Sequence, residues 1–415
     1  MTPRRVDGVS TGRAPSESGP EPVLILGGGL IGLAVAHQLA RRGEKVRVLS
    51  RRRSEAAGFV AAGMLAPHAE GLSGPMLKLG QISLARIPAW VEQIETDSGL
   101  SCGLRACGIV VPFATAQQRD AYPTAAFGTT LTRAGLELEI PGIGPRWQAG
   151  LLFPQDGQID NRRQLMRALE RACVERGVAF EEGAEVLGLI RHQGGALDAV
   201  RIRRAQGDEA TFSCRRAVLA CGAWSARLLP ELPVVPVKGQ MLSLQGPRNA
   251  LKRVLFGPGT YLVPREDGLL VVGATSEPDA AFSEGLTPFG QRQLQAGIEA
   301  LLPEAASWPP MERWWGFRPG TPDEAPLLGP SPVPGLWLAT GHYRNGVLLA
   351  AITAELIAAA IPQAGDPDLA PAPIEPEAAA LLRPFRWDRF PGCKQESLPS
   401  PSPAPAQAGA RGTPP

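Results

Sequence analysis

Three glycines near the start of the chain, Gly27, Gly29 and Gly32, have the spacing of a phosphate-binding turn. In a G-x-G-x-x-G turn the first glycine permits a tight bend, the second lets a pyrophosphate approach the backbone, and the third lets a helix pack closely on a strand. The positive end of that helix attracts the phosphates. Glycines at this spacing therefore predict a dinucleotide-binding site.

The residues around the turn predict the strand, helix and second strand that such a site requires. Val23 to Leu26 form an apolar run that is typical of a buried parallel strand. A helical pattern follows to about Arg42 and stops at Gly43, and residues 45–50 (KVRVLS) predict the second strand. The glycines alone would be a weak signal, but the complete unit is a specific one.

The end of the second strand leaves the identity of the nucleotide open. An Asp or Glu at this place would accept hydrogen bonds from a ribose, but the chain has Ser50 followed by Arg51, Arg52 and Arg53. Guanidinium groups pair well with a 2′-phosphate such as that of NADP. Alternatively, the arginines form a solvated loop and Ser50 bonds a free ribose hydroxyl. The local sequence does not decide between FAD and NADP.

The composition narrows the class of protein. With 415 residues, of which 44% are hydrophobic, the chain can bury a large core in two domains. Its 42 basic and 40 acidic residues nearly cancel, which gives no indication of a nucleic-acid partner. Six cysteines and four histidines lack metal-ligand spacing. The apolar run at 346–361 is too short to span a membrane. We expect a cytoplasmic protein with reduced thiols and no metal.

The order of the predicted elements indicates an α/β fold: a doubly wound nucleotide-binding domain with an inserted, mainly antiparallel β-sheet substrate domain. Residues 21–88, 151–233 and 314–364, which include the strand-like GLLFPQDG, are assigned to the first domain, and residues 89–150 and 234–313 to the second. Residues 365–397 are expected to form a C-terminal extension, and the polar or Pro-rich residues 1–20 and 398–415 to be disordered tails.

Several ordered segments resemble the D-amino-acid-oxidase-like flavoproteins. They are GGGLIGLAVAHQLARRG, AAGMLAP, DGQIDNRRQLMRAL, AVLACGAWS, VKGQM, YLVPREDGLLVVGAT, GFRPGTPDEAPLLG and GHYRNGVLLA. The last three are most similar to the glycine oxidases of thiamine biosynthesis within that family. The resemblance covers residues 22–361 and implies that the glycine turn holds the ADP half of FAD, so Ser50 is a departure from the family's acidic ribose ligand.

The resemblance also implies the residues that hold the flavin. The cofactor positions are Gly27, Gly29, Leu30, Ile31, Gly32, Ser50, Arg51, Ala62, Gly63, Met64, Val186, Gly222, His342, Tyr343, Arg344, Asn345, Gly346, Val347 and Leu348. The segment Ala62 to Met64 would pack beside the flavin, and Val186 would offer its backbone to the adenine. The segment from His342 to Leu348 would run along the ring. No cysteine matches the family's covalent attachment positions, so FAD is expected to be non-covalent.

Three further positions match the substrate site of the family. Arg318 in GFRPG falls where the substrate carboxylate is clamped, and a guanidinium can give that carboxylate two parallel bonds. Arg344 falls at the substrate and the flavin, and Tyr261 would close the site and offer its hydroxyl to the carboxylate. Without the resemblance, Arg318 would be interpreted as part of a surface salt bridge and Arg344 as a residue that packs at the start of a helix. Tyr261 would be interpreted as a core residue.

The implied activity is oxidation of glycine and small amines, such as sarcosine and small D-amino acids, with oxygen as the acceptor. A hydride would pass from Cα to flavin N5, giving the imine and then glyoxylate, ammonia and hydrogen peroxide. The glycine imine would be handed to a thiazole synthase for the thiazole of thiamine. The alternatives are a D-amino-acid dehydrogenase and a non-catalytic flavin-binding regulator. A homo-oligomer is compatible with all three.

Overall fold

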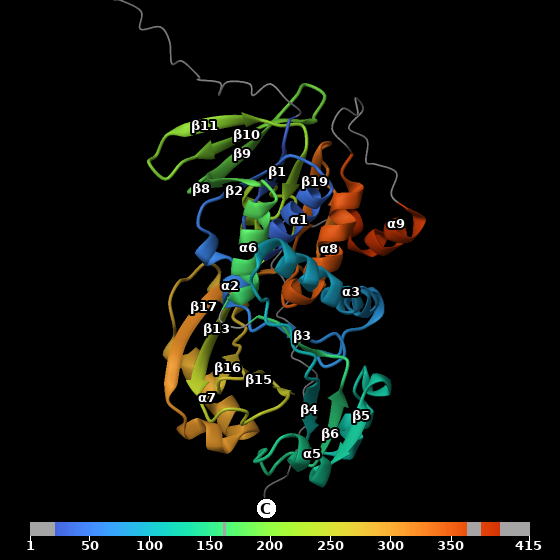
Figure 1. The fold of residues 1–415 in the computed structure, drawn as a ribbon, viewed down its shortest axis with the longest axis vertical. Coiled ribbons are helices and arrows are strands. Elements are labelled where there is room, and N and C mark those ends of the chain that lie inside the picture. Colours follow the sequence, from blue (N-terminus) through green and yellow to red (C-terminus); the bar gives the residue numbers. More distant parts are fainter. Residues whose placement is uncertain (1–20, 161–162, 363–374, 391–415) are drawn as a thin grey trace, which may run out of the picture.

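The computed structural model describes residues 21–160, 163–362 and 375–390. The predicted tails, 1–20 and 398–415, lie outside the described residues, as does most of the predicted extension. Figure 1 shows two regions, one built around a mainly parallel sheet and the other around a larger sheet, with a group of helices beside the first. Among the described residues, no helix is both long and apolar enough to cross a lipid bilayer.

The first region is built on a six-stranded sheet. Its order is β18 (Leu327–Pro330), β19 (Leu336–Thr340), β12 (Ala217–Leu219), β1 (Val23–Leu26), β2 (Val46–Ser50) and β8 (Ala179–Glu182). The neighbouring strands are parallel except for the pair β18 and β19. The predicted strands on both sides of the glycine turn are confirmed, and their carboxyl ends meet at one edge, where α/β folds bind ligands.

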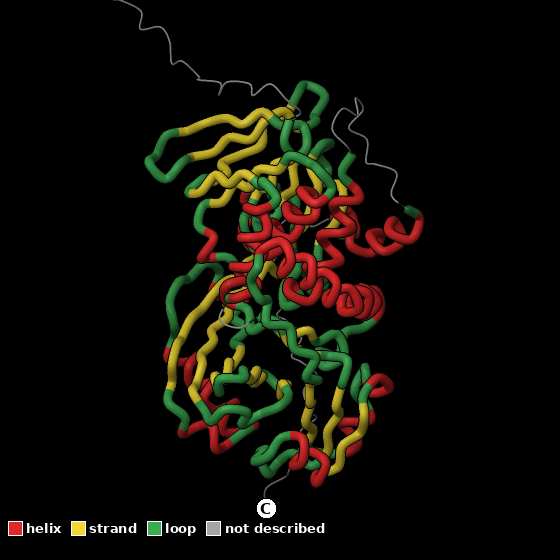
Figure 2. The backbone as a smooth tube through the Cα atoms, in the orientation of Figure 1, coloured by secondary structure: helices red, strands yellow, loops and turns green. Residues whose placement is uncertain are grey.

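Both faces of this sheet are covered, as a parallel sheet requires. Val23 and Ile25 of β1 pack into a cluster with the helices, and Leu24 and Leu26 pack into a cluster on the opposite face. The helices, which Figure 2 shows gathered together, are α1 (Leu30–Arg41), α3 (Gly74–Ser98), α6 (Gln164–Glu175) and α8 (Gly346–Ala360). The opposite face is covered by an antiparallel sheet of β9 (Glu185–Arg191), β10 (Leu197–Arg203) and β11 (Glu209–Ser213).

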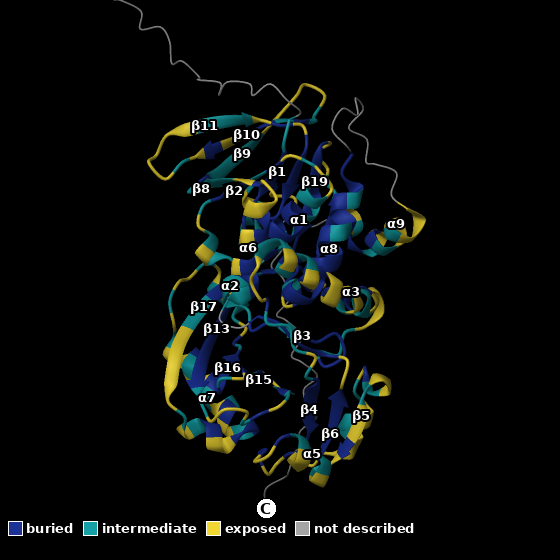
Figure 3. Ribbon diagram, in the orientation of Figure 1, coloured by how far each residue is buried: buried dark blue, intermediate teal, exposed yellow. Residues whose placement is uncertain are grey.

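The second region is an eight-stranded sheet. Its order is β17 (Pro310–Gly320), β13 (Val235–Gln245), β16 (Leu269–Gly273), β15 (Thr260–Pro264), β14 (Val254–Gly257), β4 (Ile109–Phe113), β6 (Ala149–Phe153) and β5 (Thr129–Thr132). All its neighbours are antiparallel except β14 and β4. The helices α5 (Arg133–Glu139) and α7 (Pro288–Leu301) add apolar side chains to its core, and Figure 3 shows the central strands buried. The expected α/β fold class is confirmed.

Short elements complete the chain. They are α2 (Ala57–Val60), β3 (Met64–Leu65), α4 (Ala116–Asp120), β7 (Gly157–Gln158) and α9 (Pro376–Leu382). The strands β3 and β7 pair with each other, and β3 begins at Met64, the last residue of the segment that was expected beside the flavin.

Two strands and one helix lie differently from the predicted division of the chain. The strand in GLLFPQDG is β6, which pairs with β4 and β5 in the eight-stranded sheet and not with the six-stranded sheet. Likewise, β17 pairs along its length with β13. Conversely, α3 continues past residue 88, and its later turns pack in the core of the first region. Because β6 is buried throughout, its apolar run fits either sheet.

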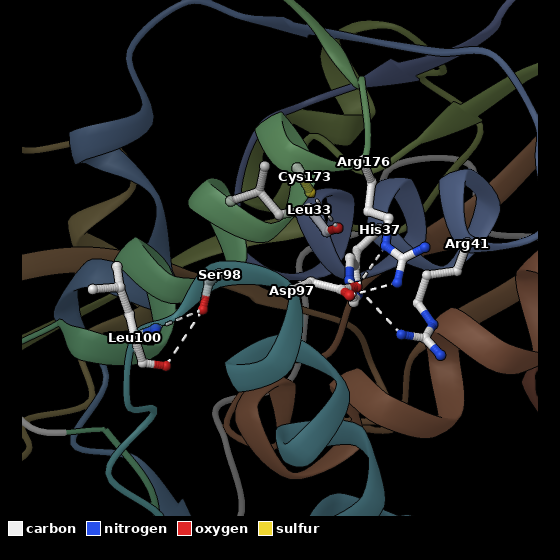
Figure 4. Close-up of polar contacts among 8 residues, drawn as sticks. All are labelled: Leu33, His37, Arg41, Asp97, Ser98, Leu100, Cys173 and Arg176. Carbon is white, nitrogen blue, oxygen red and sulfur yellow. Dashed lines mark hydrogen bonds and ion pairs between the residues drawn. The ribbon is translucent and has the colours of Figure 1, made fainter.

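An ion cluster centred on Asp97 joins three helices of the first region. Figure 4 shows His37, Arg41 and Arg176 pointing at the Asp97 carboxylate at the end of α3. His37 Nε2 lies 2.7 Å from Asp97 Oδ2, and Arg176 Nη2 donates to Oδ1 at 2.5 Å. The Arg176 hydrogen bond, followed by the other hydrogen bonds and charges, keeps the pKa of Asp97 well below its usual value despite the opposing effect of burial. The ionised carboxylate therefore stabilises the packing of α1, α3 and α6.

Replacing Asp97 by asparagine is expected to lower the free energy of unfolding at pH 7 by roughly 2 kcal/mol, since charged hydrogen bonds are lost. A carboxyl group with a lowered folded pKa stabilises above its unfolded pKa and loses that contribution as the pH falls through the folded pKa. The difference between Asp97→Asn and the parent should therefore shrink below about pH 4. Urea unfolding across pH tests both claims. The control is Asp208→Asn: Asp208 is exposed and its partner Arg204 is only partly buried, so little change is expected.

Candidate active site

The glycine turn has the geometry predicted for phosphate binding. Gly27 has a φ of +115°, and a Cβ there would overlap the carbonyl oxygen of Ala220. A Cβ on Gly32 would overlap the carbonyl oxygen of Gly27, so both glycines permit close packing of backbone on backbone. At Gly29, in contrast, the nearest protein atom to such a Cβ lies 3.4 Å away, in Ala56. The turn is therefore closed toward the protein and leaves room for a ligand at Gly29.

A cleft runs from this turn to the large sheet and encloses about 1800 Å³ of empty space, including its open mouth. It reaches β13, β15 and β17 at its far end. The predicted residues that line it are Gly27, Gly29, Leu30, Ile31, Ser50, Arg51, Ala62, Gly63, Met64, Val186, Gly222, Tyr261, Arg318, His342, Tyr343, Arg344, Gly346 and Val347. The fold thus brings segments that are distant in the sequence to one site.

Three predicted cofactor residues do not line the cleft. Gly32 packs behind the turn, and Asn345 precedes the first residue of α8 and is buried. Leu348 is 1% exposed, and its carbonyl oxygen accepts a hydrogen bond of 2.5 Å from Ser83 in α3. The Leu348 side chain therefore contributes to the interface between the two helices, and its assignment to the flavin stays a prediction.

The arginines after β2 are already paired with carboxylates. Arg51 Nη2 and Arg52 Nη2 lie 2.7 Å and 3.0 Å from the two oxygens of Glu55. Arg53 lies 2.8 Å from Glu170 and 2.9 Å from Glu182. These acids neutralise the positive charge of the arginines, which would otherwise attract a 2′-phosphate. The arginine run is thus neither a free phosphate site nor a simple solvated loop, and the alternative of NADP loses its support.

The start of α8 faces the cleft. Gly346 begins this 15-residue helix, so its positive end is directed at the site. His342 lies just before it, and its Nε2 is 3.0 Å from Thr353 Oγ1 within the helix. Burial lowers the pKa of His342 to about 3. The ring is therefore neutral and held by the helix, which leaves it poorly suited to act as a base.

Arg318 and Tyr261 lie together at the far end of the cleft. Arg318 Nη1 donates to the carbonyl oxygen of Thr275 at 3.0 Å. Burial raises the pKa of Tyr261, while the charge of Arg318 opposes the rise. The neighbouring strands carry Gly239 and Gly273, where a Cβ would overlap the guanidinium and the phenol ring respectively. The sheet therefore has space shaped around the two side chains, and their N–H and O–H groups can bind an anion.

Sequence reasoning missed an acid at this end of the cleft. Glu70 Oε2 lies 3.4 Å from Arg344 Nε, and the Glu70 side chain is only 8% exposed. It lies six residues after Met64, beyond the end of the matched segment AAGMLAP. The available signal was an acidic residue in a mainly apolar stretch, whereas a carboxylate substrate directs attention to cations and hydroxyl donors.

The cleft contains one cysteine among the described residues, Cys221. Its thiol donates to the carbonyl oxygen of Leu26 at 3.1 Å, and burial raises its pKa to about 12. A protonated, hydrogen-bonded thiol is a poor nucleophile, which agrees with the expected non-covalent cofactor. Within the described ranges, no group of His, Cys, Asp and Glu side chains could hold a metal ion.

These features fit a dinucleotide with a redox-active ring: an open turn for the pyrophosphate, a helix end along the middle, and an anion-binding group beyond it. The model of the FAD dependent oxidoreductase (DAO) family matches residues 22–360. The chain belongs to this family. FAD is therefore its cofactor, with the glycine turn and the lining residues as the groups available to hold it.

Known members of the family are similar over most of the chain. The bifunctional protein ThiO/ThiG of Synechocystis is 44% identical over 343 residues, which are 81% of this chain and 50% of that protein. A glycine oxidase of Pseudomonas aeruginosa is 33% identical over 86% of this chain and 98% of its own length. The crystal structure of glycine oxidase from Geobacillus kaustophilus superposes with a TM-score of 0.78 at 30% identity, covering 89% of this chain and 99% of that one. The chain spans about half the length of the ThiO/ThiG relatives.

Proposed function

We propose that this flavoprotein oxidises glycine and small amines such as sarcosine and small D-amino acids, with oxygen as the acceptor. The observation that carries the proposal is the pair of Arg318 and Tyr261 at the end of the cleft that begins at the glycine turn. An α-amino acid needs a carboxylate handle beyond the flavin, and this pair supplies it. The relatives named glycine oxidase support the choice of substrate.

Arg318, Tyr261 and the start of α8 each have a part in this reaction. Arg318 binds the substrate carboxylate through two N–H groups, and Tyr261, protonated because burial raises its pKa, donates a third hydrogen bond. These contacts fix the substrate so that its Cα faces the cofactor. When bound, FAD supplies the acceptor for the hydride from Cα. The positive end of α8 favours negative charge in the middle of the cleft.

The product of glycine oxidation in this scheme is the imine, which water converts to glyoxylate and ammonia, with hydrogen peroxide as the second product. We propose that the imine is handed to a thiazole synthase for the thiazole of thiamine. The bifunctional ThiO/ThiG relatives, in which a similar region forms part of a longer protein, support this partner. A cytoplasmic location suits such a hand-off.

A peroxide assay across glycine, sarcosine, D-alanine and D-proline, with an oxygen electrode in parallel, tests the proposal. Glycine or sarcosine should give peroxide and consume oxygen in equal amounts. Bleaching of bound FAD by glycine without oxygen uptake would instead indicate a dehydrogenase with another acceptor. If none of the four amines bleaches the flavin under anaerobic conditions, the proposed oxidase activity is wrong.

A further inference from the structure

The substrate end of the cleft contains a buried acid that the proposed reaction does not use. Glu70 lines the cleft together with Arg318, Arg344 and Tyr261. Its Oε2 lies 3.4 Å from Arg344 Nε, so it pairs with the second of the two guanidinium groups. Arg318, in contrast, has a neutral carbonyl oxygen, that of Thr275, as its hydrogen-bond acceptor. A carboxylate therefore neutralises the charge of Arg344, whereas the acceptor of Arg318 is uncharged, although both guanidinium groups line the same cleft.

Glu70 is held in place by a tightly bonded turn. Its backbone N–H donates to the carbonyl oxygen of Ala66 at 3.0 Å. The carboxylate of Asp156, fully buried before β7, accepts the backbone N–H groups of His68 and Ala69 at 3.2 Å and 2.8 Å. Tyr122 adds a hydrogen bond of 2.7 Å to the carbonyl oxygen of Ala69. These bonds fix the backbone of the turn that carries Glu70 and so place its side chain next to Arg344.

Glu70 and Arg344 each shift the pKa of the other. Burial raises the pKa of Glu70, while the positive charges of Arg344 and Arg318 lower it. In return, the Glu70 charge is the largest influence that raises the pKa of Arg344. The Arg344 side chain is 38% exposed and lines the cleft, so its guanidinium is accessible to an incoming anion. Glu70 neutralises the positive charge that would attract that anion. Glu324 contributes a weaker negative charge and does not line the cleft.

We propose that Glu70 restricts this site to substrates with a single carboxylate. It occupies Arg344 and cancels its charge, which leaves Arg318 to bind the one carboxylate of an amino acid. Its own negative charge also repels a second carboxylate, and such a repulsive group is how a site rejects a ligand that its attractive groups would accept. This inference rests on the proposed oxidase function and identifies the residue that limits its substrate class.

The test compares two substrates that differ by one carboxylate. Sarcosine is N-methylglycine, and iminodiacetate carries a carboxylate on that methyl group. In the FAD-loaded parent protein, sarcosine should be strongly preferred by kcat/KM. In Glu70→Gln, which keeps the size of the side chain and removes its charge, the ratio of iminodiacetate to sarcosine should rise by about tenfold or more. Glu70→Ala should raise the ratio in the same direction, which guards against a folding defect of one variant.

Three controls assign the effect to the charge beside Arg344. Glu70→Asp retains a carboxylate and should keep the parent ratio, and so should Glu324→Gln, which removes an acid outside the cleft. Adding Arg344→Gln to Glu70→Gln should cancel the gain for iminodiacetate. An unchanged ratio in both charge-removing variants would overturn the inference while leaving the oxidase function intact. A parent protein that oxidises neither glycine nor sarcosine would instead overturn the proposed function itself.

Discussion

Replacing Arg318 by alanine is expected to lower kcat/KM for glycine at least about thirtyfold. The reason is the loss of a charge-assisted pair with the substrate carboxylate in a partly desolvated cleft, which typically costs about 2–5 kcal/mol. At roughly 1.4 kcal/mol per tenfold change, the lower end of that range corresponds to the stated factor. Steady-state kinetics with glycine, measured by peroxide release from the purified flavoprotein, gives the value directly.

The character of the loss distinguishes a substrate clamp from a structural arginine. Arg318→Lys should recover only part of the activity, because an ammonium group cannot make the planar two-point contact. An amine without a carboxylate should be affected far less by either substitution. Bound FAD and its absorption spectrum should persist, since Arg318 is assigned to the substrate. A variant that loses FAD, or that oxidises glycine at the parent rate, would contradict the clamp.

The elements that could be predicted from the sequence are those whose signal is local. The turn at Gly27 to Gly32 and the strands around it confirm the prediction because turn, helix and strand patterns lie within one continuous segment. The placement of β6 and β17 could not be obtained in this way. Their partners are chosen by contacts with β4, β5 and β13, which are remote in the sequence. In addition, β6 is buried throughout, so it has no alternation of apolar and polar residues to indicate its sheet.

The same difference between local and long-range signals applies to the residues of the candidate site. The cations and the tyrosine were found because the segments around Arg318, Arg344 and Tyr261 resemble a known family, and the fold brings all three to one cleft. Their assigned roles remain predictions. Glu70 was missed because its significance depends on a distance to Arg344, which is 274 residues away in the chain. A carboxylate near a guanidinium is a property of the fold, and no spacing along the sequence encodes it.

The glycines of the turn differ in structure, and this difference predicts different defects for Gly29→Ala and Gly32→Ala. A methyl group on Gly29 meets no protein atom closer than 3.4 Å, so the cofactor-free protein should keep its melting temperature. The added methyl group would occupy the space of the pyrophosphate. It would thereby remove about two charged hydrogen bonds to the pyrophosphate, each worth roughly 1.5–3 kcal/mol. FAD affinity should therefore fall at least about a hundredfold.

In Gly32→Ala the added methyl group would overlap the carbonyl oxygen of Gly27, a backbone atom that cannot rotate away. The helix α1 must shift from β1, and overpacking of this kind typically costs about 1–3 kcal/mol, so this variant should melt at a lower temperature even without FAD. Flavin fluorescence titration and thermal unfolding of the cofactor-free proteins separate the two defects. Gly188→Ala, which meets no atom within 4 Å, is the control and should change neither quantity. If Gly29→Ala binds FAD as the parent does, the turn does not hold the pyrophosphate, because a phosphate in contact with that backbone would be displaced by the added methyl group.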